Sequence, residues 1–186
     1  MRAFPKSVKR LAPFWMYLLL ASCLSAATLV QLSLTDLIRQ STTIEHATVL
    51  SSWAAASGRV VYTHYKVQIS EQMKGPAISE IVVLGGAANG MVQAFAGAPQ
   101  LNPGEDYVFF LYTNQAARTY VTGLTQGLFR VNVDGTANPG LTRNASRERV
   151  LDPKTGRQVL DQTLSMKLAD LRTQIASVLA TAKGGQ

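Results

Sequence analysis

Tyr107-Val108-Phe109-Phe110-Leu111-Tyr112 is the most hydrophobic β-forming stretch in this chain of 186 residues. Aromatic and β-branched side chains favour strands because they pack well on a pleated surface. Pro103-Gly104, a few residues earlier, has the residue types of a type II turn. We therefore expect Tyr107–Tyr112 to form the central strand of a sheet.

Further β segments lie on both sides of this strand. In Tyr65–Ser70, apolar and polar residues alternate, as expected where one face of a sheet packs on a core and the other meets water. The other predicted strands are Ala47–Trp53, Ile81–Leu84, Met91–Phe95, Tyr120–Leu124 and Leu128–Val133. Short strands separated by turn residues predict a mainly β fold, either a closed barrel or a sandwich.

A short helix is predicted before the first strand. Ser33-Leu34-Thr35-Asp36 resembles a capping box, in which Ser33 accepts from a free helix N–H and Asp36 reaches back toward the cap. Leu34, Leu37 and Ile38 then fall on one face at helical spacing. The pattern predicts a helix over Leu34–Gln40.

The C-terminal part combines a polar segment with an amphipathic one. Residues 136–162 are polar, basic and rich in turn residues, so we expect a long surface loop with a short hairpin around Val150 and Val159. An apolar stripe at helical spacing then predicts a helix over residues 165–182. We expect this helix to cover an open face or end of the barrel.

The first 27 residues have the layout of a secretory signal. Three cations within residues 6–10 precede the apolar run Leu11–Ala21, which ends among small residues. This run is shorter than the about 20 apolar residues that a transmembrane helix needs. We therefore expect residues 1–27 to be removed on export, which leaves residues 28–186 as a single secreted or periplasmic domain.

The signal contains two possible cleavage sites. Ser25-Ala26-Ala27 places small residues where a signal peptidase selects them, with Thr28 as the new N-terminus. Leu20-Ala21-Ser22-Cys23 resembles a bacterial lipoprotein signal, and Cys23 is the only cysteine. We expect cleavage at the first site, because helix and strand patterns begin almost directly after Thr28 and leave little room for a tether. Lipidation of Cys23 is the alternative, and it would place the protein on a membrane. Retention of the uncleaved leader as a membrane stub is a third possibility.

The leader also carries much of the positive charge. Four of the 18 lysines and arginines lie in it, so the remaining chain has 14 cations against 11 carboxylates, a formal charge of +3. Five of these cations lie within residues 143–157, where we expect a solvated loop. Nucleic-acid binding needs aromatic residues interleaved with basic ones, and the aromatic stretch Tyr107–Tyr112 contains no cation. We expect no nucleic-acid partner.

Residues suited to catalysis are sparse in this sequence. A nucleophilic triad needs a serine or cysteine beside a histidine oriented by a carboxylate, and His46 and His64 are the only histidines. The chain has no Gly-x-Ser-x-Gly turn and no His-x-x-x-His pair of zinc ligands. We therefore expect no catalytic residues, no metal site and no cofactor. A weak metal-dependent or hydrolytic enzyme is the competing class.

Two glycine-containing loops are the candidate binding surface, because scaffolds present functional residues on loops. The first runs from Gly85 to Gly90. A phosphate-binding loop would have to open a helix, whereas the residues that follow have a strand pattern, so we expect a hairpin that turns at Asn89-Gly90. The second loop runs from Gly97 to Pro103. The candidate binding residues are Gly85, Gly86, Asn89, Gly90, Gly97 and Pro99.

Several stretches together resemble an uncharacterised family of exported bacterial proteins, over nearly the whole chain after residue 27. They are Leu32-Ser33-Leu34 with Leu37, Val61-Tyr62-Thr63 with Glu71, Lys74-Gly75, Gly85-Gly86, Gly97-Ala98-Pro99, Pro103-Gly104-Glu105, Phe110-Leu111 and Gly123 to Val131. That family is distantly similar to the netrin-like module of the tissue inhibitors of metalloproteinases. The resemblance implies a five-stranded oligonucleotide/oligosaccharide-binding (OB) barrel with flanking helices, and a binding rather than catalytic role.

The resemblance has a gap at the N-terminus. The inhibitors address the protease zinc with an N-terminal cysteine, and a chain that begins at Thr28 has none. Ala47 also replaces the glycine that the family usually carries in its first strand. We therefore expect an OB-like barrel of five to seven strands that serves as an exported, non-enzymatic binding domain. Its expected partner is another exported protein or an envelope component.

Overall fold

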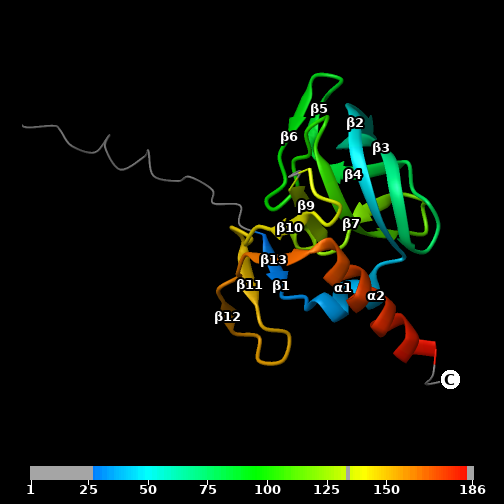
Figure 1. Cartoon of the computed structure of the whole chain (residues 1–186). Coiled ribbons are helices and arrows are strands. Elements are labelled where there is room, and N and C mark those ends of the chain that lie inside the picture. The colour runs from blue at the N-terminus through cyan, green and yellow to red at the C-terminus, as the bar shows by residue number, and fades with distance from the viewer. Residues whose placement is uncertain (1–26, 133–134, 184–186) are drawn as a thin grey trace, which may run out of the picture.

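The computed structural model describes residues 27–132 and 135–183 of the chain. Cys23 and the rest of the predicted leader before Ala27 lie outside the described residues. The described chain is mainly β, as predicted, and carries one α-helix near each end (Figure 1). These helices are α1 (Leu34–Gln40) and α2 (Leu168–Lys183).

The strands form a main sheet, a small three-stranded sheet and a hairpin. The main sheet contains β2 (Thr43–Ser57), β3 (Val60–Lys74), β4 (Glu80–Leu84), β7 (Asp106–Thr113), β8 (Thr119–Val121), β9 (Leu128–Asn132), β10 (Gly140–Arg143) and β13 (Leu164–Lys167). The small sheet contains β1 (Thr28–Val30), β11 (Arg149–Leu151) and β12 (Gln158–Val159). The hairpin consists of β5 (Gly86–Ala88) and β6 (Met91–Gln93), and it projects from the end of the molecule away from the two helices (Figure 1).

The main sheet is open, so the expectation of a closed barrel is wrong. Its strand order is β13-β10-β9-β7-β2-β3-β4, with β8 paired to β7, and no ladder joins β4 to β13 among the described residues. β4 lies close to β8 without pairing to it. Val82 of β4 and Tyr120 of β8 line one hollow together with Phe95 and Pro99. Side chains therefore line a hollow between β4 and β8 in place of a backbone ladder.

β7 is the central strand, which confirms the prediction from its sequence. It pairs antiparallel with β2 along one edge and with β8 and β9 along the other. Val108 and Phe110 point to one hydrophobic core, whereas the alternate residues Tyr107, Phe109 and Leu111 point to another. Alternation along one strand therefore supplies two cores.

Each core has its own cover. α1 and α2 lie side by side over the first core, where Leu37, Leu171 and Ile175 are buried (Figure 1). Residues of β2, β3 and β4 cover the second core together with Leu101 from the connection before β7. From Tyr107 to Leu111, both faces of β7 are consequently shielded from water, which explains the unbroken hydrophobic sequence there.

α1 is fixed at both ends by side chains. The predicted capping box is present: Ser33 Oγ accepts from the Asp36 N–H at 3.1 Å, and Asp36 Oδ2 accepts from the Ser33 N–H at 3.1 Å. At the other end, Lys74 Nζ donates to the carbonyl oxygens of Ile38 at 2.6 Å and Ser41 at 2.5 Å. A cation at this position complements the helix dipole and ties α1 to the end of β3.

The segment 136–162 is not a surface loop throughout, which corrects the prediction. β10 lies within it, between β9 and β13 of the main sheet. The predicted hairpin is confirmed, since Val150 faces Val159 in the pairing of β11 with β12. The polar composition of this segment predicted a loop because β10 and β11 are short strands set among turn residues.

The C-terminal helix begins at Leu168 rather than at residue 165. The four residues before it form β13, because an edge of β10 is available for pairing and their alternating pattern suits a strand. The Leu168 N–H donates to the Pro139 carbonyl at 3.0 Å, and the Ala169 N–H donates to Asn138 Oδ1 at 2.9 Å. The 138–139 turn therefore satisfies two free N–H groups of the first helical turn.

Other strand boundaries also differ from the prediction. β2 is much longer than the predicted Ala47–Trp53, and β6 ends before the predicted limit at Phe95. β8 ends at Val121, because Gly123 and Leu124 have positive φ angles of 65° and 57° and start a short 3-10 helix, η2 (Leu124–Gly127). The end of the predicted strand Leu128–Val133 lies outside the described residues.

Glu45 on β2 is a fully buried carboxyl group beside the second core. Its Oε2 accepts a hydrogen bond from the Ile78 N–H at 3.1 Å, whereas its Oε1 has no partner among the described residues. Burial disfavours the charged form and raises the pKa of Glu45 to about 7, although the Ile78 hydrogen bond acts in the opposite direction. Folding therefore favours the protonated acid.

We expect the free energy of unfolding to fall as the pH rises from about 5 to about 8. The unfolded chain loses this proton near the ordinary pKa of 4.5, whereas the folded protein keeps it until about pH 7. The stabilisation from the protonated group is therefore complete below pH 4.5 and is lost as the pH passes through 7. At about 1.4 kcal/mol for each pKa unit, the total loss is about 3 kcal/mol.

Urea unfolding at a series of pH values measures this effect. Glu45→Gln keeps an acceptor for Ile78 but has no proton to lose, so its stability should vary less across the same pH range. A variant whose stability falls as steeply as that of the unsubstituted protein would contradict the assignment.

Candidate functional site

A polar cleft of about 650 Å³ lies beside the Gly97 loop, and it is the candidate functional site. Gly97 and Pro99 are among its lining residues. The other candidate binding residues belong to the β5–β6 hairpin, where Asn89 and Gly90 have positive φ angles of 51° and 74° at the predicted turn. The described hairpin residues do not line the cleft, so the two predicted loops do not form one surface.

The cleft has three walls lined by hydrogen-bonding groups. One wall comes from the connection before β7 and another from η2 and β9. The third comes from β10, the connection after it and Thr163 before β13. Its uncharged polar residues are Gln100, Asn102, Thr125, Thr142, Asn144, Ser146 and Thr163. Its charged residues are Glu105, Arg130, Arg147 and Glu148. Such a lining suits a polar ligand that makes many hydrogen bonds.

Glu105 is held in the cleft as a carboxylate. Its Oε1 pairs with Arg130 Nη2 at 2.7 Å, and its Oε2 accepts from the Tyr107 hydroxyl and, at 3.0 Å, from Asn102 Nδ2. The Tyr107 hydrogen bond is the main cause of a lowered pKa of Glu105. The pKa of Tyr107 is raised, first by burial and then by this carboxylate. The arrangement holds the Glu105 carboxylate against Arg130, Tyr107 and Asn102.

Arg147 and Arg130 are both exposed cations of this cleft, and Arg130 is paired with Glu105. Its guanidinium makes no ion pair or hydrogen bond within residues 27–132 and 135–183. A guanidinium has five N–H donors in a planar fork that matches a carboxylate or phosphate. Arg147 is therefore the group of the cleft most suited to meet an external anion.

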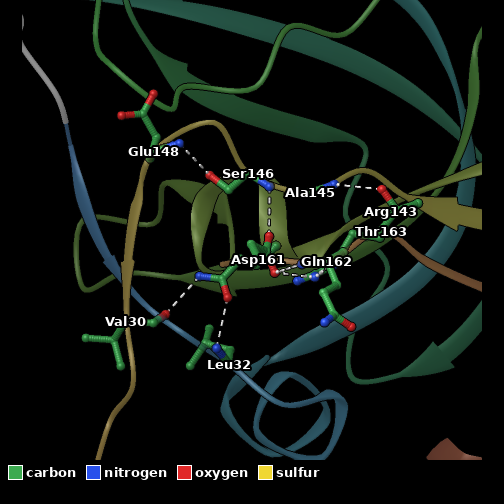
Figure 2. A network of polar contacts seen from close by, with 10 residues as sticks. Val30, Leu32, Arg143, Ala145, Ser146, Glu148, Asp161, Gln162 and Thr163 are labelled. Atoms are coloured by element: carbon green, nitrogen blue, oxygen red, sulfur yellow. Dashed lines mark hydrogen bonds and ion pairs between the residues drawn. The ribbon is translucent and has the colours of Figure 1, made fainter. Parts of the chain in front are cut away.

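A buried ion pair supports the wall that carries Arg147 (Figure 2). Arg143 Nη2 contacts Asp161 Oδ1 at 2.7 Å and also donates to the Gln162 carbonyl at 2.7 Å. The two paired side chains are only 4% and 1% exposed. The other Asp161 oxygen accepts from the Ser146 N–H at 2.7 Å, which fixes the connection after β10 to the segment before β13.

Gln126 makes a second buried link close to this wall. Its Oε1 accepts from the Leu32 N–H at 2.8 Å, and its Nε2 donates to the Val30 carbonyl at 2.9 Å (Figure 2). The amide therefore joins the end of β1 to η2. Local sequence patterns do not mark Gln126 or Asp161 as buried, and they predicted a solvated loop around Arg143. Nothing in the local pattern reveals contacts between residues so far apart in the chain.

The Gly97 segment separates the polar cleft from a second, apolar hollow. This hollow has a volume of about 370 Å³ and is lined in part by Phe95, Tyr112 and Leu124. Gly97 has a φ angle of +74°, and a Cβ atom there would lie 3.0 Å from Glu148 Cγ and 3.1 Å from Leu124 Cδ1. A side chain at position 97 would therefore make tight contact with both walls, and the positive φ angle also favours glycine there.

Neither histidine lines the cleft among its described residues. His46 Nε2 lies 3.1 Å from Asp106 Oδ2, and the Thr48 hydroxyl donates to the other oxygen of Asp106 at 2.6 Å. The hydroxyl thus contacts the carboxylate rather than the imidazole, unlike the order of a nucleophilic triad. His64 Nδ1 lies 2.8 Å from Glu80 Oε1, and its ring stacks on Trp53.

Similarity to known proteins gives no indication of what the cleft does. No protein-family model and no curated protein matches the chain. In the part of the chain that the structure describes, no three His, Cys, Asp or Glu residues are grouped to hold a metal ion. None of the described helices has the length and apolar composition required to span a membrane.

Breaking the buried ion pair should destabilise the protein strongly. Asp161→Asn leaves the Arg143 charge buried without a carboxylate, and we expect a loss of about 3–5 kcal/mol in the free energy of unfolding. Glu71→Gln is the matched control, because it removes a carboxylate from the Arg172 pair, whose side chains are 43% and 32% exposed. The control should lose no more than about 1 kcal/mol. Equal losses in urea unfolding would contradict the role given to Asp161.

Gly97→Ala and Gly90→Ala form a matched pair for the wall between the two hollows. Both glycines have a φ angle of +74°, but a Cβ atom at Gly90 has no neighbour within 4 Å. Both variants pay a conformational cost of about 1 kcal/mol. We expect Gly97→Ala to lose about 1–3 kcal/mol more, through overpacking. Thermal unfolding measures the difference, and equal midpoints would show that the wall tolerates a methyl group.

Proposed function

We propose that the protein is an exported, non-enzymatic binding domain whose partner occupies the polar cleft. The observation that carries this proposal is which charged side chains of the cleft are paired with one another and which are not. Glu105 and Arg130 hold one another, while Arg147 lacks a partner among the described residues. Groups fixed in this way bind a ligand with little loss of side-chain freedom.

The proposed partner is another exported protein or an envelope component that presents an acidic group. Arg147 supplies the complementary charge, and the hydroxyl and amide groups around it supply further hydrogen bonds. The Arg143–Asp161 pair beneath the wall is consistent with this role, because it keeps the wall in one position when no partner is bound.

Export followed by cleavage after Ala27 belongs to the same proposal. β1 begins at Thr28, directly after the predicted cleavage point, so removal of the leader leaves every described strand intact. Lipidation of Cys23 stands as the alternative, in which a tether of a few residues would precede β1. The mass of the exported protein distinguishes a Thr28 start from a diacylated Cys23.

We further propose that the main sheet is an opened variant of an OB-like barrel. The flanking helices and the close approach of β4 to β8 support this reading of the architecture. In such a variant, the hollow between β4 and β8 corresponds to the missing ladder.

Cross-linking capture from the native exported fraction tests the binding proposal. Arg147→Glu reverses the unpaired charge of the cleft, and we expect roughly tenfold less partner at a fixed bait concentration, equivalent to about 1.4 kcal/mol. Arg59→Glu is the control, because it makes the same charge change at an exposed position outside the cleft lining. Equal recovery of the partner with both variants would show that the cleft is not part of the binding surface.

A further inference from the structure

Glu148 is a carboxylate of the cleft wall with an unusual partner. Its Oε2 accepts a hydrogen bond at 3.0 Å from the N–H of Ala27, which is 121 residues away in the sequence. The described residues provide no cation for this carboxylate. A charged acceptor thus contacts a neutral amide at the first of the described residues.

Glu148 lies between Ser146 and Gly97. Its own N–H donates to Ser146 Oγ at 3.2 Å (Figure 2), and its Cγ lies 3.0 Å from the place of a Cβ on Gly97. Ser146 is in turn held by Asp161 through the buried ion pair. The side chain is therefore confined between the Gly97 wall and the beginning of β1.

β1 brings the predicted cleavage point to this carboxylate. Thr28 is aligned with Arg149 in the parallel pairing of β1 with β11, so its backbone lies next to the Glu148–Arg149 peptide. Thr28 follows Ala27 directly, and consecutive Cα atoms are about 3.8 Å apart. The backbone nitrogen of Thr28 is therefore the next one along the chain from the Ala27 nitrogen that contacts Glu148.

We infer that cleavage after Ala27 completes the cleft wall, because the α-ammonium group of Thr28 replaces the Ala27 amide as the partner of Glu148. The inference rests on the proposed export. In the cleavage, a signal peptidase adds water across the Ala27–Thr28 amide, so that Ala27 leaves with a carboxylate and Thr28 keeps the amine. That amine is protonated at neutral pH, since α-amino groups have an ordinary pKa of about 7.7–8.0.

The new ion pair has two consequences for the site. It adds a charge-assisted contact to β1, a strand of only three residues. It also pairs the second carboxylate of the cleft, so that Arg147 becomes the unbalanced charge of the described lining. The precursor and the mature protein would then present different net charges to a partner at the same surface.

The pKa of the Thr28 α-amino group tests the inference. The full chain with its leader is expressed in a bacterial host, the exported form is purified, and its intact mass establishes the N-terminus. After ¹³C reductive methylation, an NMR titration should give an α-amino pKa about 1 unit above the ordinary value, which means about tenfold tighter proton binding in the ion pair. An ordinary pKa in a protein that starts at Thr28 would overturn the inference.

Two variants identify the carboxylate responsible. Glu148→Gln should return the pKa to the ordinary range, while Asp170→Asn, an equal charge change at an exposed position on α2, should leave it raised. A raised pKa in Glu148→Gln would assign the effect to another group and overturn the inference. A mass that shows diacylated Cys23 or an intact leader would reject the cleavage step itself, whereas the Arg147→Glu capture judges the binding function independently.

Discussion

Burial of β7 on both faces is the constraint on which the rest of the structure depends. Phe109 and Phe110 are adjacent, point to opposite faces and are both completely buried. Each such side chain contributes about 1.5–3 kcal/mol only if water is excluded from its own face. One layer of cover cannot satisfy both residues, so the chain has to supply a second. The two helices provide one cover, and the bent strands β2 to β4 with Leu101 provide the other.

The second cover determines where the cleft lies. Leu101 is anchored in the second core, which holds the segment between Gly97 and Glu105 close to the start of β7. The same segment then forms one wall of the cleft and separates it from the apolar hollow. The opposite wall rests on polar contacts, because Ser146 is fixed by Asp161. Hydrophobic burial thus places one wall, and a buried charge pair places the other.

The parts of the fold that local patterns determine could be predicted from the sequence. α1, the Asn89-Gly90 turn, the facing pair Val150 and Val159, and β7 follow from capping, turn chemistry or β propensity. The boundary between β13 and α2 could not be predicted, because both periods fit its residues and only the edge of β10 decides between them.

Of the candidate binding residues named from the sequence, only Gly97 and Pro99 line the cleft. Its loop position marked this segment as a candidate, but nothing local indicated that it would face Glu148 and Arg147. The Asp161–Ser146 and Gln126–Leu32 contacts join residues 15 and 94 positions apart, and polar residues in turn-rich segments are usually solvated. Those contacts exist because the surrounding strands bury the groups, and buried polar atoms require partners. β1 pairs with β11 across nearly the whole length of the chain, through three aligned residue pairs. The polar links at Asp161, Gln126 and Glu148 all lie at this point, where the short backbone ladder of β1 needs the most support.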